Sequence, residues 1–275
     1  MSALDEILKS RGLGSSGAKP AAAVTSKGPG TPPKTPEGSP IVYMDVVQGT
    51  SDWAALRAGI PTASQFHRII TPKGSPSKSQ DKYLYELIAE RLTGEPTVGY
   101  TSHWMDRGSE LEAEAVGYYE FQREVETVKI GFVTNAAGTV GASPDRFVGA
   151  NGALEIKVPT PANHVGYLLQ DGDAYADHKI QAQGQLWVAQ KDWNDLLSYC
   201  PGLPFALHRT DRDEDFIEML AGEVGRFSER LEALWLTCLE RGWAPKPKEA
   251  PPMSASDHMR EALLDAARAK QEVSR

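Results

Sequence analysis

The stretch Ser143–Pro159, SPDRFVGANGALEIKVP, carries three charges (Asp145, Glu155 and Lys157) in a segment that otherwise has the pattern of a β-hairpin. Residues two apart in a strand face the same side, so Glu155 and Lys157 project together while Ile156 points into the core. An exposed hairpin with an ordinary cross-strand ion pair would explain this pattern. A catalytic site that needs charges of both signs on one face is the alternative explanation.

The length of the turn decides whether Asp145 joins the other two charges. A two- or four-residue loop would pair Asp145 with Ile156, on the wrong face, whereas a three-residue loop or a glycine bulge pairs it with Glu155. Gly149 and Gly152 supply the backbone freedom that the second arrangement needs. We therefore predict the odd register, with all three charges on one face of the hairpin.

The chemistry of these charges favours a metal site. Two adjacent carboxylates repel each other unless a cation lies between them, and their oxygens suit Mg²⁺ or Mn²⁺. A lysine beside such a site can hold or activate a water molecule, or steady a scissile phosphate, as metal-assisted phosphodiester hydrolysis requires. The pattern is weak by itself, because a second acid-x-Lys occurs at Asp177–Lys179 in a predicted helix, without a partner acid. The hairpin alone leaves both interpretations open.

Three further segments bear on the choice: WAALRAGIPTAS (Trp53–Ser64), MDRGSELEAEAVGYYE (Met105–Glu120) and HKIQAQGQLWV (His178–Val188). Together with the hairpin segment GASPDRFVGANGALEIKVP (Gly141–Pro159), they resemble in order the lambda-type (YqaJ-like) phage recombination exonucleases of the PD-(D/E)XK nuclease superfamily. The first segment resembles the family's opening Trp-x-x-Leu-Arg-x-Gly-x-x-Thr-Ala-Ser signature, and the second its Arg-Gly-x-x-x-Glu helix. The hairpin resembles the family's catalytic hairpin, and the last segment the Gln-x-Gln helix that follows it. The resemblance spans about residues 45–240 and favours the nuclease.

The resemblance implies a set of metal ligands. Glu112, Asp145 and Glu155 would bind the metal, helped by the main-chain carbonyl of Ile156. The implied cofactor is Mg²⁺, for which Mn²⁺ would substitute, with two ions in the site. Three carboxylates opposite two divalent ions would leave a net positive site for a phosphate.

The resemblance also assigns roles around the metal. Lys157 would position and activate the nucleophilic water, and Gln181 would orient Lys157 or that water. Arg57, Ser64 and Ser143 would contact a terminal 5′-phosphate on DNA. Their chemistry suits that role, because arginine binds a phosphate bidentately and serine adds short hydrogen bonds.

Two positions depart from the family pattern. Arg146 stands where the family usually has glycine, and it could reach DNA or be a solvated strand residue; we favour the second interpretation. Asn163 stands where some members have a basic residue. Recognition of the 5′-phosphate would then be weaker or differently built, with His164 as one candidate.

The implied fold is α/β: a PD-(D/E)XK restriction-endonuclease-like core with a mixed central β-sheet flanked by helices. Periodicity predicts helices at 53–57, 63–70, 82–95, 107–123, 178–190 and 215–241, and strands at 128–135, 140–148, 153–159, 195–201 and 205–210. We assign residues 41–245 to the exonuclease domain. Residues 1–40 are predicted to be a disordered tail, in which LDEILKSRG could form one short helix. Residues 246–275 would form a linker and a short C-terminal helix.

Composition bounds these expectations. The chain has 275 residues, of which 40% are hydrophobic, enough to bury a substantial core. Its formal net charge of −8 gives no overall basic character, although a local groove can still be basic. No apolar run reaches the roughly 18 residues that span a bilayer, and the N-terminus lacks a signal-peptide core. We expect a soluble protein of the bacterial or phage-infected host cytoplasm, with Cys200 and Cys238 as buried thiols.

The sequence therefore predicts a deoxyribonuclease. The resemblance implies a Mg²⁺-dependent exonuclease that resects linear double-stranded DNA 5′→3′, leaving 3′ single-stranded tails for phage-type recombination. It also implies DNA ends as substrate, a ring-shaped homotrimer, a single-strand annealing protein as partner, and no membrane association. An endonuclease of the same superfamily and a non-catalytic DNA-binding scaffold are the alternatives. The full set Glu112, Asp145, Glu155, Lys157 and Gln181 argues against the scaffold, because a protein without catalysis has no need of all five.

Overall fold

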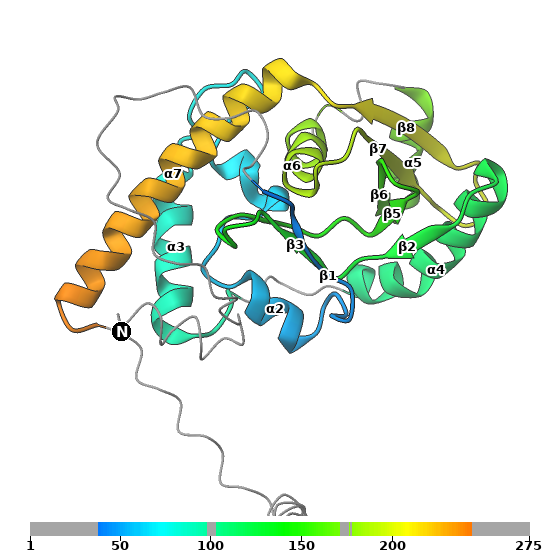
Figure 1. The fold of residues 1–275 in the computed structure, drawn as a ribbon. Helices are drawn as coiled ribbons and strands as arrows, with labels where there is room; N and C mark the ends of the chain where they lie inside the picture. Colours follow the sequence, from blue (N-terminus) through cyan, green and yellow to red (C-terminus); the bar gives the residue numbers. More distant parts are fainter. Residues whose placement is uncertain (1–37, 98–102, 171–175, 177, 244–275) are drawn as a thin grey trace, which may run out of the picture. The chain divides into compact units, whose positions relative to one another are not determined.

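The structure is a computed structural model, drawn as a ribbon in Figure 1; it describes residues 38–97, 103–170, 176 and 178–243, and of 103–110 only the backbone. The described residues belong to one compact unit, Pro32–Arg275. The predicted tail 1–40 lies almost wholly outside them, and the predicted segment 246–275 lies entirely outside them. The expectations for both segments remain predictions. Within the described part of the chain, no helix is long and apolar enough to cross a membrane.

The main sheet is mixed, as predicted. Its five strands lie in the order β2-β5-β6-β7-β8, with β6 and β7 parallel and the other neighbouring pairs antiparallel. The strands are β2 (Thr127–Lys129), β5 (Arg146–Val148), β6 (Gly152–Lys157), β7 (Trp193–Ser198) and β8 (Ala206–Asp211). A parallel pair needs a long crossover, and helices α5 (Pro161–Leu169) and α6 (Lys179–Ala189) lie within the one that joins β6 to β7.

A second, antiparallel sheet is not expected from the sequence. It contains β1 (Ile41–Tyr43), β3 (Phe132–Thr134) and β4 (Gly141–Ala142) in the order β1-β3-β4. The predictions of single strands at 128–135 and 140–148 are therefore wrong, because each segment divides between the two sheets. At Gly131 the chain packs so closely that a Cβ atom would lie 2.0 Å from the carbonyl oxygen of Val46. At Pro144 it lacks the N–H that a continuous ladder needs.

The β5–β6 hairpin has the predicted odd register. Val148 pairs with Gly152 across a three-residue loop. Continuing this register places Asp145 opposite Glu155, which brings the two acids to the same face. Gly149 begins the loop with φ of +56°, a left-handed conformation that glycine adopts without strain.

The two faces of β6 meet different helices, and in Figure 1 α6 and α4 (His103–Arg123) lie on either side of the strand. Leu154 and Ile156 pack with Tyr119 of α4 in a buried cluster. Glu155 projects from the opposite face and contacts α6. The alternation along β6 thus separates a hydrophobic core from a polar site.

The longest helix confirms the prediction for 215–241. It is α7 (Glu214–Glu240), which packs against α3 (Gln80–Thr93) with the rings of Tyr83 and Phe227 stacked at 5.5 Å. Asp213 precedes α7 and accepts a hydrogen bond from the main-chain N–H of Phe216, 3.0 Å away, so it caps the helix.

The remaining helices differ from expectation in one respect. The predicted helical segments at 53–57 and 63–70 are α2 (Ser51–Arg57) and the 3-10 helix η1 (Ala63–Arg68). Helix α5 is not predicted by the apolar pattern. Its signal is Thr160 followed by Pro161, since threonine caps a helix and proline suits its first turn.

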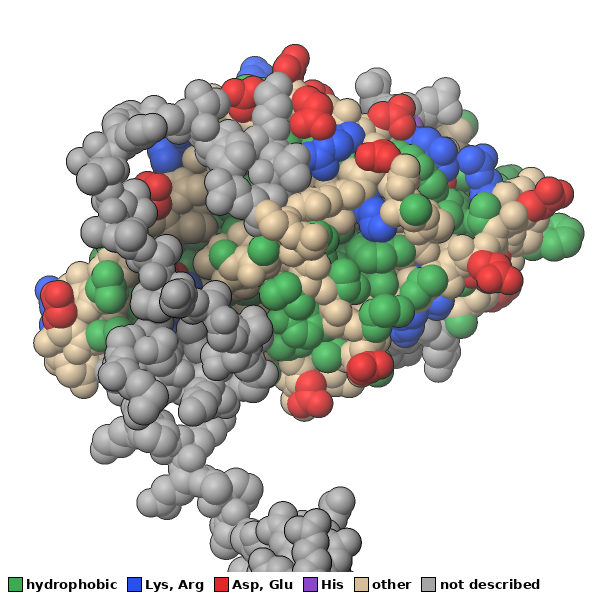
Figure 2. Space-filling view, in the orientation of Figure 1, with side chains coloured by type: hydrophobic (Ala, Val, Ile, Leu, Met, Phe, Trp, Pro, Cys, Tyr) green, Lys and Arg blue, Asp and Glu red, His purple; other side chains and the backbone are tan. Residues whose placement is uncertain are grey.

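The surface in Figure 2 mixes basic and acidic side chains, and hydrophobic side chains gather in the middle of this face. Several apolar residues of β1 and the following segment are exposed, among them Ile41, Val42, Met44 and Val47. Charges of both signs are thus interspersed on this face. The chain as a whole has a formal net charge of −8.

Candidate active site

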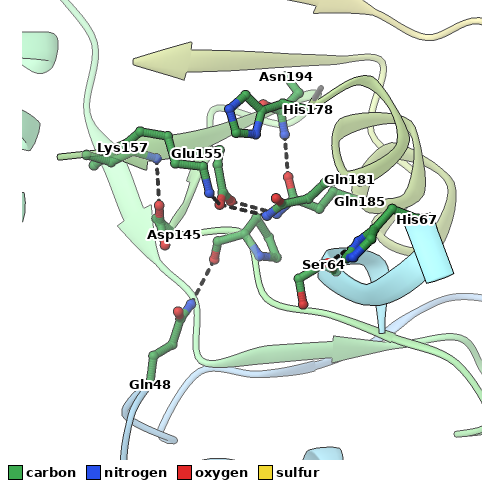
Figure 3. A network of polar contacts seen from close by, with 12 residues as sticks. Gln48, Ser64, His67, Asp145, Glu155, Lys157, His178, Gln181, Gln185 and Asn194 are labelled. Carbon is green, nitrogen blue, oxygen red and sulfur yellow. Dashed lines mark hydrogen bonds and ion pairs between the residues drawn. The ribbon is translucent and has the colours of Figure 1, made fainter. Parts of the chain in front are cut away.

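The three charges of the hairpin lie together (Figure 3). The main-chain N–H of Ile156 donates a hydrogen bond of 2.6 Å to Oδ2 of Asp145, and Nζ of Lys157 lies 2.7 Å from Oε1 of Glu155. Burial raises the pKa of the Asp145 carboxyl well above its usual value, and the negative charges of Glu155 and Glu112 raise it further. Glu155 and Glu112 are therefore both close enough to repel the Asp145 carboxylate.

Lys157 is a donor in this arrangement. Burial alone would lower its pKa, but the charge of Glu155 and the hydrogen bond to it outweigh burial and raise the pKa above its usual value. The side chain is consequently a cation at neutral pH, able to hold a water molecule or a phosphate oxygen.

Gln181 contacts the same carboxylate as Lys157. Its Nε2 donates to Oε1 of Glu155 at 2.7 Å, and its expected role, to orient Lys157 or a water molecule, stays a prediction. Lys157 and Gln181 thus meet at one shared oxygen. Gln185 donates to the other oxygen, Oε2, also at 2.7 Å, and the sequence analysis missed it. Its position one helical turn after Gln181 is the signal that could have found it.

The carboxylates fit a divalent cation by their chemistry. Oxygen ligands of this kind suit Mg²⁺ and Mn²⁺, and mutual repulsion at Asp145 is what a cation would relieve. Glu112, half-buried on α4, contributes to that repulsion. Over the described ranges, however, no three His, Cys, Asp or Glu side chains already form a metal-binding group. Lys157, Gln181 and Gln185 occupy the oxygens of Glu155 instead.

A second cluster brings together the three residues predicted to bind a terminal phosphate. The guanidinium of Arg57 donates to Oγ of Ser143 at 3.0 Å and to Oγ of Ser64 at 3.3 Å. It also donates to Oγ1 of Thr62 at 3.3 Å and lies 4.2 Å from the ring centre of Trp53. Thr62 and Trp53 were not predicted; Nε1 of Trp53 donates to Ser143 at 3.1 Å and so helps to hold it.

Arg57 is a half-buried cation. Burial lowers its pKa, but a guanidinium stays protonated at neutral pH. Among the residues that the structure describes, no carboxylate forms an ion pair with Arg57. Its donors face hydroxyl groups instead, an arrangement that suits an incoming anion.

Gln48 holds the segment between the two clusters. Its Nε2 donates to the carbonyl oxygens of Ile130 and Pro144, at 2.8 and 3.0 Å. It therefore pins both points at which the chain passes between the two sheets. No local pattern marks Gln48 in the sequence, because its partners lie more than 80 residues away.

Two further side chains, Tyr167 and His178, lie near Lys157. The hydroxyl of Tyr167 lies 2.6 Å from Nε2 of His178, and their rings stack at 6.0 Å. Tyr167 also acts electrostatically on Lys157. Neither residue was predicted to be functional from the sequence.

His164 is not a phosphate ligand. It is fully buried, with Nδ1 2.7 Å from Oγ of Ser198 and Nε2 2.8 Å from the carbonyl oxygen of Pro204. Both ring nitrogens are thus used within the fold, and the histidine fixes α5 to the loop after β7. Arg146 projects from β5 on the face of Leu154, with which it pairs, and is half-buried rather than fully solvated.

A mixed sheet whose hairpin presents an aspartate opposite a Glu-x-Lys defines a nuclease of the PD-(D/E)XK type. Comparison with known proteins places the chain within that class. The YqaJ-like viral recombinase domain matches residues 52–192. The chain therefore belongs to the family of YqaJ-like viral recombinase domains.

Solved structures agree with this assignment. An alkaline exonuclease (LHK-Exo) from Laribacter hongkongensis is 30% identical, with a TM-score of 0.62 over 70% of this chain and 98% of that one. The same enzyme in complex with dAMP matches with the same values. A phage related exonuclease from Haemophilus somnus 129PT shares 16% identity, with a TM-score of 0.52 over 65% and 96% of the chains, and supports the fold alone. No curated protein matched by sequence. The chain is thus an exonuclease of the YqaJ alkaline-exonuclease type.

Proposed function

We propose that this exonuclease resects linear double-stranded DNA from the 5′ end and leaves a 3′ single-stranded tail. The observation that carries the proposal is the position of the Arg57 cluster beside the hairpin. Ser143, which accepts from Arg57, is two residues from Asp145. A strand whose terminal phosphate binds Arg57 would therefore present its first phosphodiester near the carboxylates.

Arg57, Ser64 and Ser143 would recognise the phosphate. A guanidinium and hydroxyl groups together make charge-assisted hydrogen bonds to phosphate oxygens, and a phosphate would supply the anion that Arg57 lacks. A strand end that carries a 5′-hydroxyl could not make these contacts. The cluster would thus favour 5′-phosphorylated ends.

The proposed cofactor is Mg²⁺, with Mn²⁺ as a substitute and two ions per site. Glu112, Asp145 and Glu155 would hold the metal, with the main-chain carbonyl of Ile156. When bound, these ions would neutralise the charge that develops on the phosphodiester. Glu155 would exchange its contact with Lys157 for one with the metal.

Lys157 would then be released toward the substrate. Its ammonium would then be free to donate a hydrogen bond to the attacking water and so position that water beside the phosphorus. Gln181 would keep Oε1 of Glu155 in place after Lys157 leaves it. The dAMP bound to the related alkaline exonuclease supports a mononucleotide product.

We propose the same biological setting as the family's description suggests. The exonuclease would act in phage-type recombination, in the cytoplasm, with a single-strand annealing protein as partner. A homotrimeric ring would allow an acidic chain to enclose DNA, because only the channel need be basic. Light scattering of the pure protein tests the trimer: a mass close to that of the single chain would exclude it.

The function is tested with four DNA substrates: a 5′-phosphorylated linear duplex, its 5′-hydroxyl counterpart, a linear single strand and a closed duplex circle. Each is incubated with Mg²⁺ or EDTA and with the wild type or Lys157→Ala. We expect Mg²⁺-dependent release of mononucleotides from the 5′ ends of linear duplex, faster with the phosphate. Cleavage of the circle would make the protein an endonuclease. Binding of all four without cleavage would make it a scaffold.

A further inference from the structure

We propose that Gln185, held in one orientation by Asn194, is a positioning residue that fixes the Glu155 carboxylate for metal binding. The proposal rests on the function proposed above and adds two residues to that site. Gln185 lies on α6 and Asn194 lies on β7 (Figure 3).

The Glu155 carboxylate accepts three hydrogen bonds of 2.7 Å. Lys157 and Gln181 share Oε1, and Gln185 alone holds Oε2. Gln181 and Gln185 are four residues apart on α6, so they reach Glu155 from the same helical face. Because a metal would displace Lys157, the two glutamines are the contacts that remain to orient the carboxylate.

Glu155 on one side and Asn194 on the other set the orientation of the Gln185 amide. A carboxylate only accepts hydrogen bonds, so Gln185 must present its NH₂ group to Glu155 and its oxygen to the other side. There Nδ2 of Asn194 donates to Oε1 of Gln185 at 2.7 Å. Reversing the Gln185 amide would place oxygen against oxygen at Glu155 and nitrogen against nitrogen at Asn194. The chain from Asn194 to Gln185 to Glu155 therefore has one satisfactory arrangement.

Asn194 is placed there at a cost. It is fully buried, and its Oδ1 has no hydrogen-bond partner in the described part of the molecule. A buried amide oxygen without a partner is destabilising, so a hydrophobic residue would fill this position in the sheet better. What Asn194 contributes in return is the donor that Gln185 needs. This is the pattern of an outer-shell group that orients a metal ligand.

Gln183 is a matched control within the same helix. It is as buried as Gln185, each being 1% exposed. Its side chain points elsewhere: Nε2 donates to the carbonyl oxygen of Asp211 at 2.8 Å, and Oε1 accepts from the N–H of Asp213 at 3.0 Å. Replacing either glutamine by methionine removes two hydrogen bonds at nearly constant volume; those of Gln185 are buried and those of Gln183 are partly buried. Only Gln185→Met removes one from Glu155.

The test compares the full-length wild type, Gln185→Met and Gln183→Met. Mn²⁺ binding is measured by calorimetry without DNA, and single-turnover cleavage of linear duplex is measured as a function of Mn²⁺. We expect Gln185→Met to weaken Mn²⁺ binding by about tenfold or more, and to raise the Mn²⁺ needed for half-maximal cleavage in parallel. We expect Gln183→Met to lower the melting temperature and leave both metal readouts unchanged.

Equal Mn²⁺ affinities for the two variants would overturn the proposal, because Gln185 would then be a structural residue like Gln183. If wild type binds Mn²⁺ and degrades DNA while Gln185→Met is unaffected, this inference alone fails. If wild type neither binds Mn²⁺ nor degrades DNA, the proposed function fails and the inference falls with it.

Asn194→Ala tests the same relationship without touching Glu155, and it serves if Gln185→Met does not fold. It should weaken Mn²⁺ binding in the wild-type background and add nothing in the Gln185→Met background, since Asn194 acts through Gln185. Additive effects of the two substitutions on Mn²⁺ affinity would contradict this.

Discussion

The main-chain N–H of Ile156 donates a hydrogen bond of 2.6 Å to Oδ2 of Asp145, so the backbone of one hairpin strand orients the carboxylate of the other. The same residue points its side chain into the core beneath α4. Ile156 thus links the hydrophobic face of β6 to the site above it. The geometry of the candidate site therefore depends on the register of a hairpin.

Lys157→Ala should lower the rate of cleavage about 10²–10³-fold, as loss of one well-placed charged donor does in other enzymes. The fold should persist, because the side chain is only partly buried and the hairpin backbone is unchanged. Single-turnover kinetics on linear duplex, beside a thermal melt, measure both effects. Cleavage at the wild-type rate would remove Lys157 from the mechanism.

Arg57→Ala should erase the preference for 5′-phosphorylated ends. A charged hydrogen bond is worth about 1.5–3 kcal/mol, which predicts a loss of roughly 10- to 150-fold in kcat/KM on phosphorylated duplex. Cleavage of 5′-hydroxyl duplex should change little. Ser64→Ala serves as the milder comparison, since it removes one neutral hydroxyl. An equal loss on both kinds of end would show that Arg57 acts on the fold or on catalysis generally.

Gly149→Ala should destabilise the protein by about 1–2 kcal/mol, because a side chain is strained at φ of +56°. For a domain of this size that corresponds to a fall in melting temperature of roughly 2–8 °C. Gly149→Asn should cost less, since asparagine tolerates the left-handed region better. Equal melting temperatures for all three proteins would mean that the turn relaxes without disturbing the register.

The ionised carboxylate of Asp213 should stabilise the fold, and this stabilisation should be lost when the carboxylate is protonated at low pH. The ion pair with Lys179, 2.9 Å away, and the cap on α7 lower the pKa of Asp213 below its ordinary value of 3.8. A lowered pKa in the folded state means that the stabilisation is complete above pH 3.8 and is lost as the pH falls through the lower folded value.

Asp213→Ala should therefore cost about 1 kcal/mol at pH 7, the usual value of a helix cap. The difference from wild type should shrink as the pH is lowered from 5 to 3. Urea unfolding at several pH values measures it. Asp213→Asn keeps a capping oxygen without the charge and should lose less at pH 7. A difference that stays constant with pH would exclude the carboxylate as its source.

Much of the site could be predicted because its signals are local. Strand alternation and glycine positions gave the odd register of the hairpin, which the pairing of Val148 with Gly152 confirms. The second sheet was missed because an apolar run such as 128–135 does not reveal a change of sheet in its middle. That change depends on the contact of Gly131 with the main chain of a distant segment.

The residues that support the site were harder to find. Gln48 and Asn194 contact the site only through partners that the fold brings near, and neither belongs to a recognisable motif. Gln185 lay within reach of sequence reasoning through its spacing from Gln181. Side chains that share one helix or strand can therefore be found from the sequence. Side chains that meet only when separate elements pack together are missed.

The junction of the two clusters fixes a length. Ser143 and Asp145 are joined by the single buried residue Pro144, whose carbonyl is held by Gln48. Two residues of extended chain span about 7 Å at most, so the end-binding serine and the first carboxylate cannot drift apart. On the proposed function, the short covalent link between Ser143 and Asp145 sets the size of the fragment that is removed at each step. Lengthening the tripeptide by one residue should therefore alter the size of the product.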